Sequence, residues 1–568
     1  MRYLALASDY DGTLAHHGAV NEQTVQALER LVHSGRKLIL VTGRELADLQ
    51  SVFPHFELCE RVVAENGAIL YNPATREKSI LADRPPESFI ESLRMRGVDK
   101  MSIGDVIVAT WQPYEQKALD AIRETGLELQ IIFNKDAVMI LPSGTNKMTG
   151  LSSALRELKL SLHNVIGVGD AENDHAFLSS CECAVAVANA VPALKERADF
   201  ITVSARGAGV GELIEKLIEN DASDIRPRCD MDAVLVGKSQ SGDVRLPGYG
   251  RNVLICGQSG SGKSTLVTAL LERIIDKKYQ ICLVDPEGDY ENLPGSRSIG
   301  DEKRPPSIED IEQALEDPST DLVVNLVGVP STDRPVYFSS LIRELQRCRF
   351  QAGRPHWLVI DEAHHVLPSE WALTQTALPE ELSNLVLITV HPEHVSPVAL
   401  RRINTVIVVG REPRKLMEDF GKAVTAAVPS GNDADLPRGE ALLWRVDERQ
   451  VLRFTAEAPR TEHFRHRRKY AEGRLEDERR FRFRGPQNKM DLSIQNLNMF
   501  IQVAEGIDSE TWQFHLKRGD YSKWFRNALK DLELADSIAA IERASDVPDM
   551  ESRKRIKEAI LEKYAAPA

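Results

Sequence analysis

Short apolar runs bounded by polar residues recur along two long stretches of the chain. The first stretch predicts strands at Tyr3–Ser8, Leu38–Val41 and Val165–Val168. The second stretch predicts strands at Arg251–Cys256, Gln280–Val284, Leu322–Val327, Trp357–Ile360, Leu385–Val390 and Thr405–Val409. Runs of this length are typical of strands buried in a sheet that has helices on its faces. The pattern therefore predicts two successive α/β domains, residues 1–220 and 221–455.

Two further stretches follow other patterns. Within the first domain, an insert at about residues 81–145 predicts the order strand, helix, strand, strand, at Asp105–Trp111, Tyr114–Glu124, Leu127–Phe133 and Ala137–Leu141. After Gly485 and Pro486, apolar residues recur at helical spacing in Leu492–Glu505, Ser509–Arg518 and Ser522–Leu534. We therefore expect a small α+β insert, a linker at 456–486 and an all-α C-terminal domain at 487–568.

Composition and charge narrow the class of protein. The 568 residues suffice for several domains, and 42% hydrophobic with 27% charged residues is ordinary for a globular protein. The net charge of −14 does not favour nucleic-acid binding by the whole protein, although a local basic lining stays open. No apolar run is long enough to span a membrane, and an acidic motif follows the N-terminus too closely for a signal peptide. None of the 7 cysteines forms a C-x-x-C pair, so we expect reduced thiols, no zinc site and a cytoplasmic protein.

One stretch of the second domain fits the phosphate-binding pattern G-x-x-x-x-G-K-[ST], namely Gly257, Gln258, Ser259, Gly260, Ser261, Gly262, Lys263, Ser264 and Thr265. A predicted strand precedes it and a predicted helix, Leu266–Lys277, follows it. The backbone N–H groups would surround the phosphates of ATP, Lys263 would lie near the β- and γ-phosphates, and Ser264 would reach Mg²⁺. A flexible turn between strand and helix is the alternative, but flanks, spacing and the Lys-Ser pair all favour a P-loop.

Polar residues follow the strands of the first domain at their carboxyl ends. Asp9 and Asp11 follow the first strand, Thr42 follows the second, and Asp170 follows Val165–Val168. This edge is where α/β sheets bind ligands. One carboxylate of the Asp9/Asp11 pair can attack phosphorus, while the other protonates the leaving oxygen and later activates water. Both could share a divalent cation, although the pair taken alone also fits a turn after a strand.

The combined pattern resembles the haloacid dehalogenase (HAD) superfamily of phosphatases over roughly residues 1–220. The residues that carry the resemblance are Asp9-Tyr10-Asp11-Gly12-Thr13, Thr42, Lys147 and Gly169-Asp170-Ala171-Glu172-Asn173-Asp174. Ala64-Glu65-Asn66-Gly67-Ala68 looks like a stretch common in the Cof-type branch, subfamily IIB. The insert at 81–145 resembles a small C2 cap of this family. Such a lid favours a small phosphorylated metabolite, such as a sugar phosphate or a phosphoglycolate-like compound.

The HAD resemblance also implies a role for each residue. The catalytic residues would be Asp9 as nucleophile, Asp11 as general acid/base, Thr42 as hydrogen-bond donor to the phosphoryl oxygens and Lys147 as the cation beside nucleophile and phosphate. The Mg²⁺ ligands would be Asp170, the Asp9 carboxylate and the Asp11 backbone carbonyl, with Asp174 and Asn173 in support.

The predicted strand Trp357–Ile360 ends in Asp361 and Glu362, which we interpret as the Walker B partner of the P-loop. Asp361 can hold Mg²⁺, largely through Ser264 and water, and Glu362 can deprotonate the attacking water. An acidic pair at a helix N-terminus is the alternative. At least one predicted strand separates the P-loop strand from the Walker B strand. This order, with the segment Asp285-Pro286-Glu287-Gly288-Asp289-Tyr290, resembles the HerA (DUF87) branch of the HerA/FtsK ATPases over residues 230–455.

The HerA resemblance implies a homo-oligomer, in the relatives a hexameric ring that moves DNA, with an arginine from the neighbouring subunit at each ATP site. Arg401 and Arg402 are candidates for that arginine, and equally for a surface salt bridge. The segment Thr389-Val390-His391-Pro392 departs from relatives that often carry Gln after the Thr. The large N-terminal barrel of HerA motors is also replaced here by the HAD-like domain.

A basic segment, Arg460–Arg484, combines Arg with Phe and Tyr, which can bind phosphates and stack on bases. Because Glu and Asp interrupt it, we favour a salt-bridge surface between domains or subunits. The leading hypothesis is a Mg²⁺-dependent phosphomonoesterase for a small metabolite, with an ATPase that regulates or assembles it. A nucleic-acid-processing machine whose HAD unit removes terminal phosphates, and an ATP-dependent assembly scaffold, stay open as alternatives.

Overall fold

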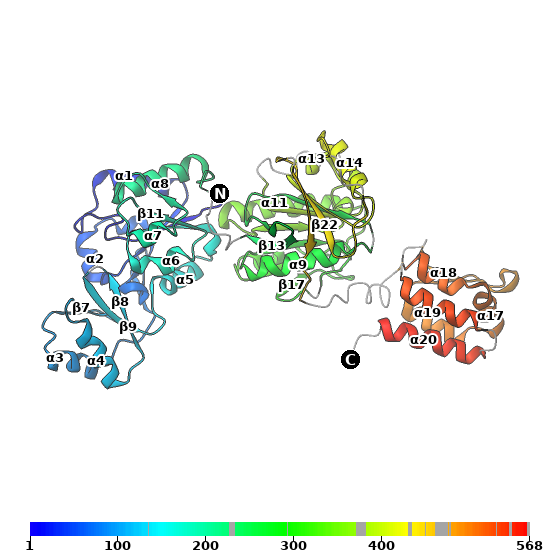
Figure 1. Ribbon diagram of the computed structural model, residues 1–568, viewed down its shortest axis with the longest axis horizontal. Coiled ribbons are helices and arrows are strands. Elements are labelled where there is room, and N and C mark those ends of the chain that lie inside the picture. The colour runs from blue at the N-terminus through cyan, green and yellow to red at the C-terminus, as the bar shows by residue number, and fades with distance from the viewer. Residues whose placement is uncertain are drawn as a thin grey trace.

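The computed structural model (Figure 1) contains two α/β units, a small cap and a helical C-terminal unit. It describes the chain except residues 135, 226–232, 259, 292, 371–381, 430–433, 449, 461–474, 476–478, 530, 545–547 and 565–568. Most of the basic segment Arg460–Arg484 therefore lies outside the described residues, as does Ser259 of the P-loop. Among the described residues, no helix combines the length and the apolar composition that crossing a bilayer requires.

The first unit is built on a sheet with the strand order β12-β11-β10-β1-β2-β3-β4-β5. Its strands are β1 (Ala5–Ser8), β2 (Lys37–Val41), β3 (Cys59–Ala64), β4 (Ile69–Asn72), β5 (Glu77–Ile80), β10 (Val165–Gly169), β11 (Cys183–Ala186) and β12 (Phe200–Ile201). Its longer helices are α1 (Glu22–His33), α2 (Leu46–Val52), α5 (Lys147–Glu157) and α8 (Arg206–Asn220), with short α6 (His175–Leu178) and α7 (Pro192–Lys195). The strands from β12 to β3 are parallel, so their carboxyl ends share one edge.

The insert between β5 and α5 has a core of its own. It contains α3 (Glu87–Met95), α4 (Glu115–Thr125) and a sheet in the order β6-β7-β9-β8, with β6 (Met101–Ile103), β7 (Val108–Trp111), β8 (Leu129–Asn134) and β9 (Ala137–Pro142). The sequence analysis did not predict α3. The strand predicted at Asp105–Trp111 begins too early, because the N–H groups of 105–107 bind the Glu65 carboxylate instead of a neighbouring strand.

The second unit contains a larger sheet in the order β14-β13-β23-β22-β21-β15-β20-β19-β16-β18-β17. The strands are β13 (Val234–Ser239), β14 (Gly242–Leu246), β15 (Val253–Gly257), β16 (Ile281–Asp285), β17 (Ser296–Ile299), β18 (Asp321–Asn325), β19 (Trp357–Ile360), β20 (Leu385–Thr389), β21 (Thr405–Val409), β22 (Glu440–Arg445) and β23 (Gln450–Ala456). From β21 to β17 the strands are parallel. The prediction that a strand separates the P-loop strand from the Walker B strand is confirmed, because β20 pairs with both β15 and β19.

Helices cover both faces of this second sheet. They are α9 (Lys263–Asp276), α10 (Ile308–Leu315), α11 (Arg334–Ala352), α13 (Pro397–Leu400) and α14 (Pro413–Val424). Alternate residues of β15 point to opposite faces, so Val253 and Ile255 join one apolar core with α9. Leu254 and Cys256 join a second core with α11 and α14. The alternation explains why the central strands are apolar along their whole length.

The C-terminal unit is helical, with α16 (Leu497–Gly506), α17 (Ser509–Arg518), α18 (Asp520–Asn527), α19 (Leu532–Arg543) and α20 (Asp549–Tyr564). The helix predicted from Leu492 begins later, because the Asn496 side chain caps it by accepting from the Met499 N–H. Residues Leu492–Ile494 instead form β25, antiparallel to β24 (Phe481–Phe483). Phe481 and Phe483, in the stretch expected as a linker, belong to the core of this unit.

Candidate functional site

Three buried charged residues form the centre of the site at the carboxyl edge of the first sheet. Asp9 follows β1, Lys147 begins α5, and Asp174 follows the loop after β10; all are 4% exposed or less. The Lys147 ammonium donates to Asp9 Oδ1 at 2.5 Å and to Asp174 Oδ1 at 2.6 Å. Although burial alone would lower the pKa of Lys147, the Asp174 and Asp9 carboxylates raise it above its usual range. Lys147 is therefore a fixed cation beside the predicted nucleophile.

Asp170 completes an acidic cluster with Asp9 and Asp174. Side-chain oxygens of these three residues lie within 4.8 Å of one another. Asp174 Oδ2 accepts from the N–H groups of Asp170 at 2.8 Å and Ala171 at 2.9 Å, which fixes the loop after β10. Burial, and then the Asp174 carboxylate, raise the pKa of Asp9 to about 7 against the opposing effect of Lys147. Three buried carboxylates facing a single ammonium fit a divalent cation such as Mg²⁺, which prefers oxygen ligands.

Gly12 brings the Asp9 loop close to this cluster. Its φ of +87° is in the left-handed region, and a Cβ there would lie 2.3 Å from Asp170 Oδ2. Any other residue at this position would push Asp170 away from the cluster.

The Asp11 carboxylate does not point into the acidic cluster. Arg44 binds it through Nε at 2.5 Å and NH2 at 2.7 Å, and the same guanidinium also binds Asp48 at 2.5 Å. The Asp11 side chain is 36% exposed, so it lies at the rim of the site. The sequence analysis gave no role to Arg44, although its position two residues after Thr42 placed it at the same edge.

Thr42 is buried directly after β2, where the sequence analysis expected it. Its hydroxyl oxygen accepts from the Arg44 N–H at 3.1 Å, and its carbonyl accepts from the Asn66 N–H at 3.0 Å. Asn173 is also buried, and its side-chain amide donates to the Asn66 side-chain oxygen at 3.3 Å. Thr42 and Asn173 thus contact the same turn, residues Glu65–Gly67.

That turn also connects the core to the cap. The buried Glu65 carboxylate accepts three backbone N–H groups at the base of the cap, from Asp105 at 2.9 Å and from Val106 and Ile107 at 2.8 Å. From the cap sheet, the Met139 sulfur lies 3.4 Å from a Cβ built on Gly43. The cap therefore reaches the catalytic edge of the sheet. The sequence analysis used Glu65 only as part of a family resemblance.

The second site lies at the carboxyl ends of β15 and β19. β15 ends at Gly257 and α9 begins at Lys263, and between them Gly260 and Gly262 have φ values of +78° and +94°. Gln258 fixes the loop to the segment after β21, because its side-chain amide donates to the Arg411 carbonyl at 2.9 Å and accepts from the Arg411 N–H at 3.1 Å.

The Walker B residues approach the P-loop lysine. Asp361 is 2% exposed after β19, and the following Glu362 has a φ of +40°. Lys263 Nζ lies 4.0 Å from Glu362 Oε1, and His364 Nδ1 lies 3.6 Å from Glu362 Oε2. The structure thus brings the predicted phosphate-binding lysine and the predicted base together. Ser264 is half-buried and Thr265 exposed at the start of α9. Arg401, exposed after α13, stays a candidate for a subunit contact.

Comparison with known proteins gives the families that the two α/β units resemble. The sequence model of the haloacid dehalogenase-like hydrolases matches residues 6–97 and 99–214, and that of the central domain of helicase HerA matches residues 244–312. The phosphoglycolate phosphatase of Methanothermobacter thermautotrophicus is 29% identical over 220 residues, which cover 38% of this chain and 98% of that protein. Phosphoglycolate phosphatase 2 of Saccharolobus solfataricus is 32% identical over 223 residues, which cover 38% and 94%.

A crystal structure of a haloacid dehalogenase-like hydrolase from Bacteroides thetaiotaomicron covers 38% of this chain and 99% of its own, with 20% identity and a TM-score of 0.34. The chain spans nearly the full length of these two phosphatases. The ranges matched by the family model contain Asp9, Lys147, Asp170 and Asp174. The chain belongs to the haloacid dehalogenase-like hydrolases, as a phosphatase of that family joined to a HerA-like P-loop ATPase domain.

Proposed function

We propose that this protein is a Mg²⁺-dependent phosphomonoesterase for a small phosphorylated metabolite, and that its ATPase domain regulates or assembles it. The observation that carries the proposal is the buried contact of Lys147 with Asp9 and Asp174, with Asp170 beside them. The substrate is a sugar phosphate or a phosphoglycolate-like compound, in keeping with the names of the two archaeal relatives.

The proposed reaction has two steps. Asp9 attacks phosphorus, the bond from phosphorus to the ester oxygen breaks, and Asp11 gives a proton to that leaving oxygen. Asp11 then takes a proton from water, whose oxygen attacks the aspartyl-phosphate and releases inorganic phosphate with Asp9 restored. Lys147 balances the charge on nucleophile and phosphate, and Thr42 donates a hydrogen bond to the phosphoryl group. Mg²⁺ held by the Asp9 and Asp170 carboxylates and the Asp11 backbone carbonyl, with Asp174 in support, would supply further positive charge at the phosphate.

Asp11 must leave Arg44 to act as acid and base. Its carboxylate is half-exposed at the rim, so a change of side-chain rotamer suffices to bring it toward a bound phosphate. The cap, connected through Glu65, would exclude water and limit substrates to small molecules.

Phosphate release from a panel of small phosphomonoesters with Mg²⁺ tests this proposal. We expect turnover of one chemical group of substrates by the wild type, and a loss of about three orders of magnitude or more in Asp9→Asn. ATP hydrolysis should be unchanged in Asp9→Asn. Equal loss of both activities would mean that the two centres are coupled or wrongly assigned, and no turnover of any compound would contradict the metabolite phosphatase.

The regulatory part of the proposal is supported by a buried contact between the two α/β units. Asn164 lies directly before β10, and His356 lies directly before β19. The Asn164 side chain donates to the Gly353 carbonyl at 3.3 Å and accepts from His356 Nε2 at 3.3 Å. The strands β10 and β19 lead to Asp170 and Asp361. The amino ends of β10 and β19 thus meet at this contact, and the two proposed catalytic sites lie at the opposite, carboxyl ends of these strands.

Glu182 is the centre of a second group of contacts at the same place. It binds Arg2, and it accepts from His163 Nδ1 at 2.6 Å and from the Tyr279 hydroxyl at 3.1 Å. The His163 ring stacks on the Tyr279 ring with centroids 3.7 Å apart, and His163 Nε2 donates to the Lys277 carbonyl at 2.7 Å. His163 thus contacts Glu182 of its own unit through one ring nitrogen and Lys277 of the second unit through the other. The Tyr279–Glu182 and His163–Lys277 hydrogen bonds and the ring stack cross from one unit to the other, whereas the Arg2–Glu182 ion pair lies within the first unit.

Glu362→Gln separates ATP binding from ATP hydrolysis. We expect this variant to bind ATP but to hydrolyse it at least about a hundredfold more slowly, because Glu362 is the proposed base. Phosphatase rates of wild type and variant, with and without ATP, measure the coupling. If ATP changes the phosphatase rate of both the wild type and Glu362→Gln, ATP binding without hydrolysis is enough for regulation. If neither phosphatase rate depends on ATP, the proposed regulation is contradicted. Undiminished hydrolysis would remove Glu362 from its proposed role.

We also propose the division of the chain into units at residues 1–220 and 221–455, a cap at about 81–145 and a helical C-terminal unit. Separate apolar cores in the first unit, the cap, the second unit and the C-terminal helices support it. The boundary predicted between 486 and 487 lies too late in the sequence, because Phe481 and Phe483 join the core of the C-terminal unit. The association of the ATPase domain into a homo-oligomeric ring is a proposal from its HerA-like family alone.

A further inference from the structure

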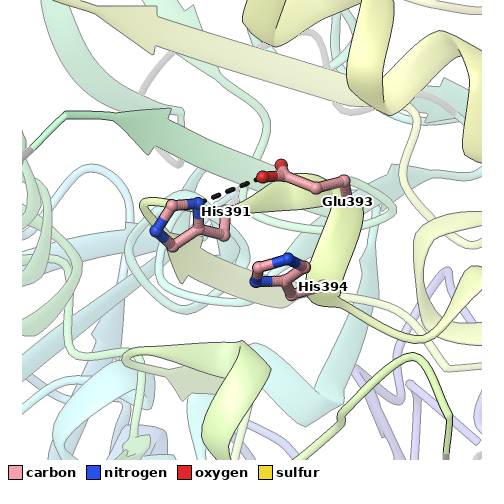
Figure 2. A group of neighbouring side chains, drawn as sticks. All are labelled: His391, Glu393 and His394. Atoms are coloured by element: carbon pink, nitrogen blue, oxygen red, sulfur yellow. Dashed lines mark hydrogen bonds and ion pairs between the residues drawn. The ribbon is translucent and has the colours of Figure 1, made fainter.

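A group of metal-binding side chains lies directly after β20, the strand between the P-loop strand and the Walker B strand. His391 follows β20, and a short helical turn, η6 (Pro392–His394), carries Glu393 and His394. Figure 2 shows the three side chains next to one another at this turn. One ligand atom from each lies within 4.8 Å of the other two. The phosphatase and nucleotide-binding residues assigned above do not include these three.

The distances suit a single bound ion. Zinc-type ions bind imidazole nitrogen at about 2.0–2.1 Å and carboxylate oxygen at about 2.0–2.2 Å, so ligand atoms of a tetrahedral site lie about 3.4 Å apart. His391 Nδ1 and Glu393 Oε1 are already 3.1 Å apart. Small rotations of the exposed side chains would bring all three atoms to one ion. The His391 and Glu393 side chains are 51% and 44% exposed, so water or another ligand can occupy the remaining position.

The ligand types select the class of ion. Two imidazoles with one carboxylate suit zinc, cobalt or nickel, whereas Mg²⁺ prefers oxygen ligands alone. Among the described residues, the other group of comparable spacing is Asp9, Asp170 and Asp174, which offers only oxygens. The two groups therefore differ in the ions that they select.

Histidines are concentrated around this turn. Four of the 14 in the chain are in ring contact there: His364 with His365 at 4.2 Å between centroids, His364 with His391 at 5.9 Å, and His391 with His394 at 4.9 Å. The Thr389 hydroxyl oxygen accepts from the His391 N–H at 3.0 Å and lies 3.1 Å from His364 Nδ1. His364 is next to the Walker B glutamate. His364 therefore connects the turn to the ATP site, because it contacts both His391 and Glu362.

We propose that His391, Glu393 and His394 bind a divalent transition-metal ion of the zinc class, beside the ATP site and separate from its Mg²⁺. The ion joins the residue after β20 to the turn that leads into α13, and so fixes the segment between the two catalytic strands of the ATPase. The His391–Glu393 hydrogen bond holds two of the ligands near each other before the ion arrives.

Metal titration of the full-length protein tests the site. The protein is freed of metal with a chelator, returned to excess Mg²⁺ to fill the oxygen sites, and titrated with Zn²⁺ by calorimetry and with Co²⁺ by visible absorption. The variants are His391→Gln and His394→Gln. The matched control is His55→Gln. His55 and Glu57 form an exposed pair two residues apart in the sequence, as His391 and Glu393 do, with Nδ1 and Oε1 3.6 Å apart, but they belong to no three-ligand group among the described residues.

We expect one Zn²⁺ per chain in the wild type and in His55→Gln, with absorption typical of nitrogen-bound Co²⁺. Each of the two variants should bind at least about tenfold more weakly. No saturable binding by the wild type, or equal binding in all four proteins, would overturn the proposal. Binding lost in Asp170→Asn but kept in the His391 and His394 variants would assign the ion to the phosphatase site and would equally overturn it.

Discussion

At the scale of the single residue, Lys147 balances the negative charge of the carboxylates in the phosphatase site. Its ammonium contacts Asp9 and Asp174, and all three side chains are buried. Lys147→Met keeps most of the side-chain volume but leaves two buried carboxylates without their cation. We expect phosphate release to fall by about three orders of magnitude or more, because Lys147 would no longer stabilise charge in the transition state.

Steady-state phosphate release measures the effect of Lys147→Met, with ATP hydrolysis as an internal check on folding. Lys216→Met is the matched control, since Lys216 lies on α8 and pairs with Asp224 away from the site. A Lys147→Met variant that retains the wild-type rate would exclude this residue from the charge balance.

Sequence reasoning worked well for residues whose position depends on strand ends. Asp9, Thr42 and Asp170 each follow an apolar run, and parallel strands bring such residues to one edge. The direction of a long side chain is a different matter. That Arg44 would bind Asp11 depends on which rotamers fit between two loops, and neither composition nor spacing determines that.

At the scale of the element, the Glu65 turn determines how the cap is held. One carboxylate accepts three N–H groups from the base of the cap. Glu65→Gln keeps the shape but removes the charge, and its amide NH₂ would face a backbone donor. We expect a loss of stability of about 1–3 kcal/mol and a lower kcat/KM for the small substrate. Thermal unfolding and steady-state kinetics measure both.

Glu60→Gln serves as the control for the Glu65 turn, because Glu60 lies on the neighbouring β3 but pairs only at the surface with Lys37. If Glu65→Gln and Glu60→Gln had the same stability and kinetics, the carboxylate would not connect the cap to the core.

Elements were predictable where a local pattern decides them. The long apolar strands of both sheets lie where the sequence placed them. The exceptions depend on distant partners. Residues Leu492–Ile494 have a pattern compatible with a helix, but pairing with Phe481–Phe483 makes them a strand. Likewise, Asp105–Ile107 leave the predicted strand because Glu65, 40 residues earlier, binds their N–H groups.

At the scale of the whole molecule, two enzymes share one buried polar contact. A cavity of about 320 Å³ lies beside it, lined from both sides by residues that include Arg2, His163, Tyr279 and His356. No sequence motif predicted this contact, because its residues lie before the amino ends of the strands, where no motif is expected. The proposed regulation of the phosphatase by the ATPase would pass through this contact.

His356 makes this contact sensitive to acid. The Gln280 N–H donates to His356 Nδ1 at 2.7 Å, so the ring proton is on Nε2, which faces Asn164. Burial, and then the positive charges of His163 and Arg354, lower the pKa of His356 well below its usual range. Below a pH of about 6.5 the unfolded chain binds a proton at this position that the folded protein does not. Stability from this residue is therefore complete above that pH and is lost as the pH falls.

We expect His356 to contribute up to about 1.4 kcal/mol of lost stability for each pH unit below about 6.5. The measurement is thermal unfolding between neutral and mildly acidic pH for wild type and His356→Gln, which cannot titrate. At neutral pH the His356→Gln variant should be less stable than the wild type, but its stability should fall less as the pH falls. The stability of His33→Gln should follow the wild type, because His33 is exposed on α1. Parallel curves for wild type and His356→Gln would mean that another group carries the acid sensitivity. If the stability of His356→Gln depends less on pH and ATP still alters its phosphatase turnover, the coupling between the two sites passes through the Glu182 contacts. If the ATP response is lost in His356→Gln, the coupling passes through the Asn164–His356 pair.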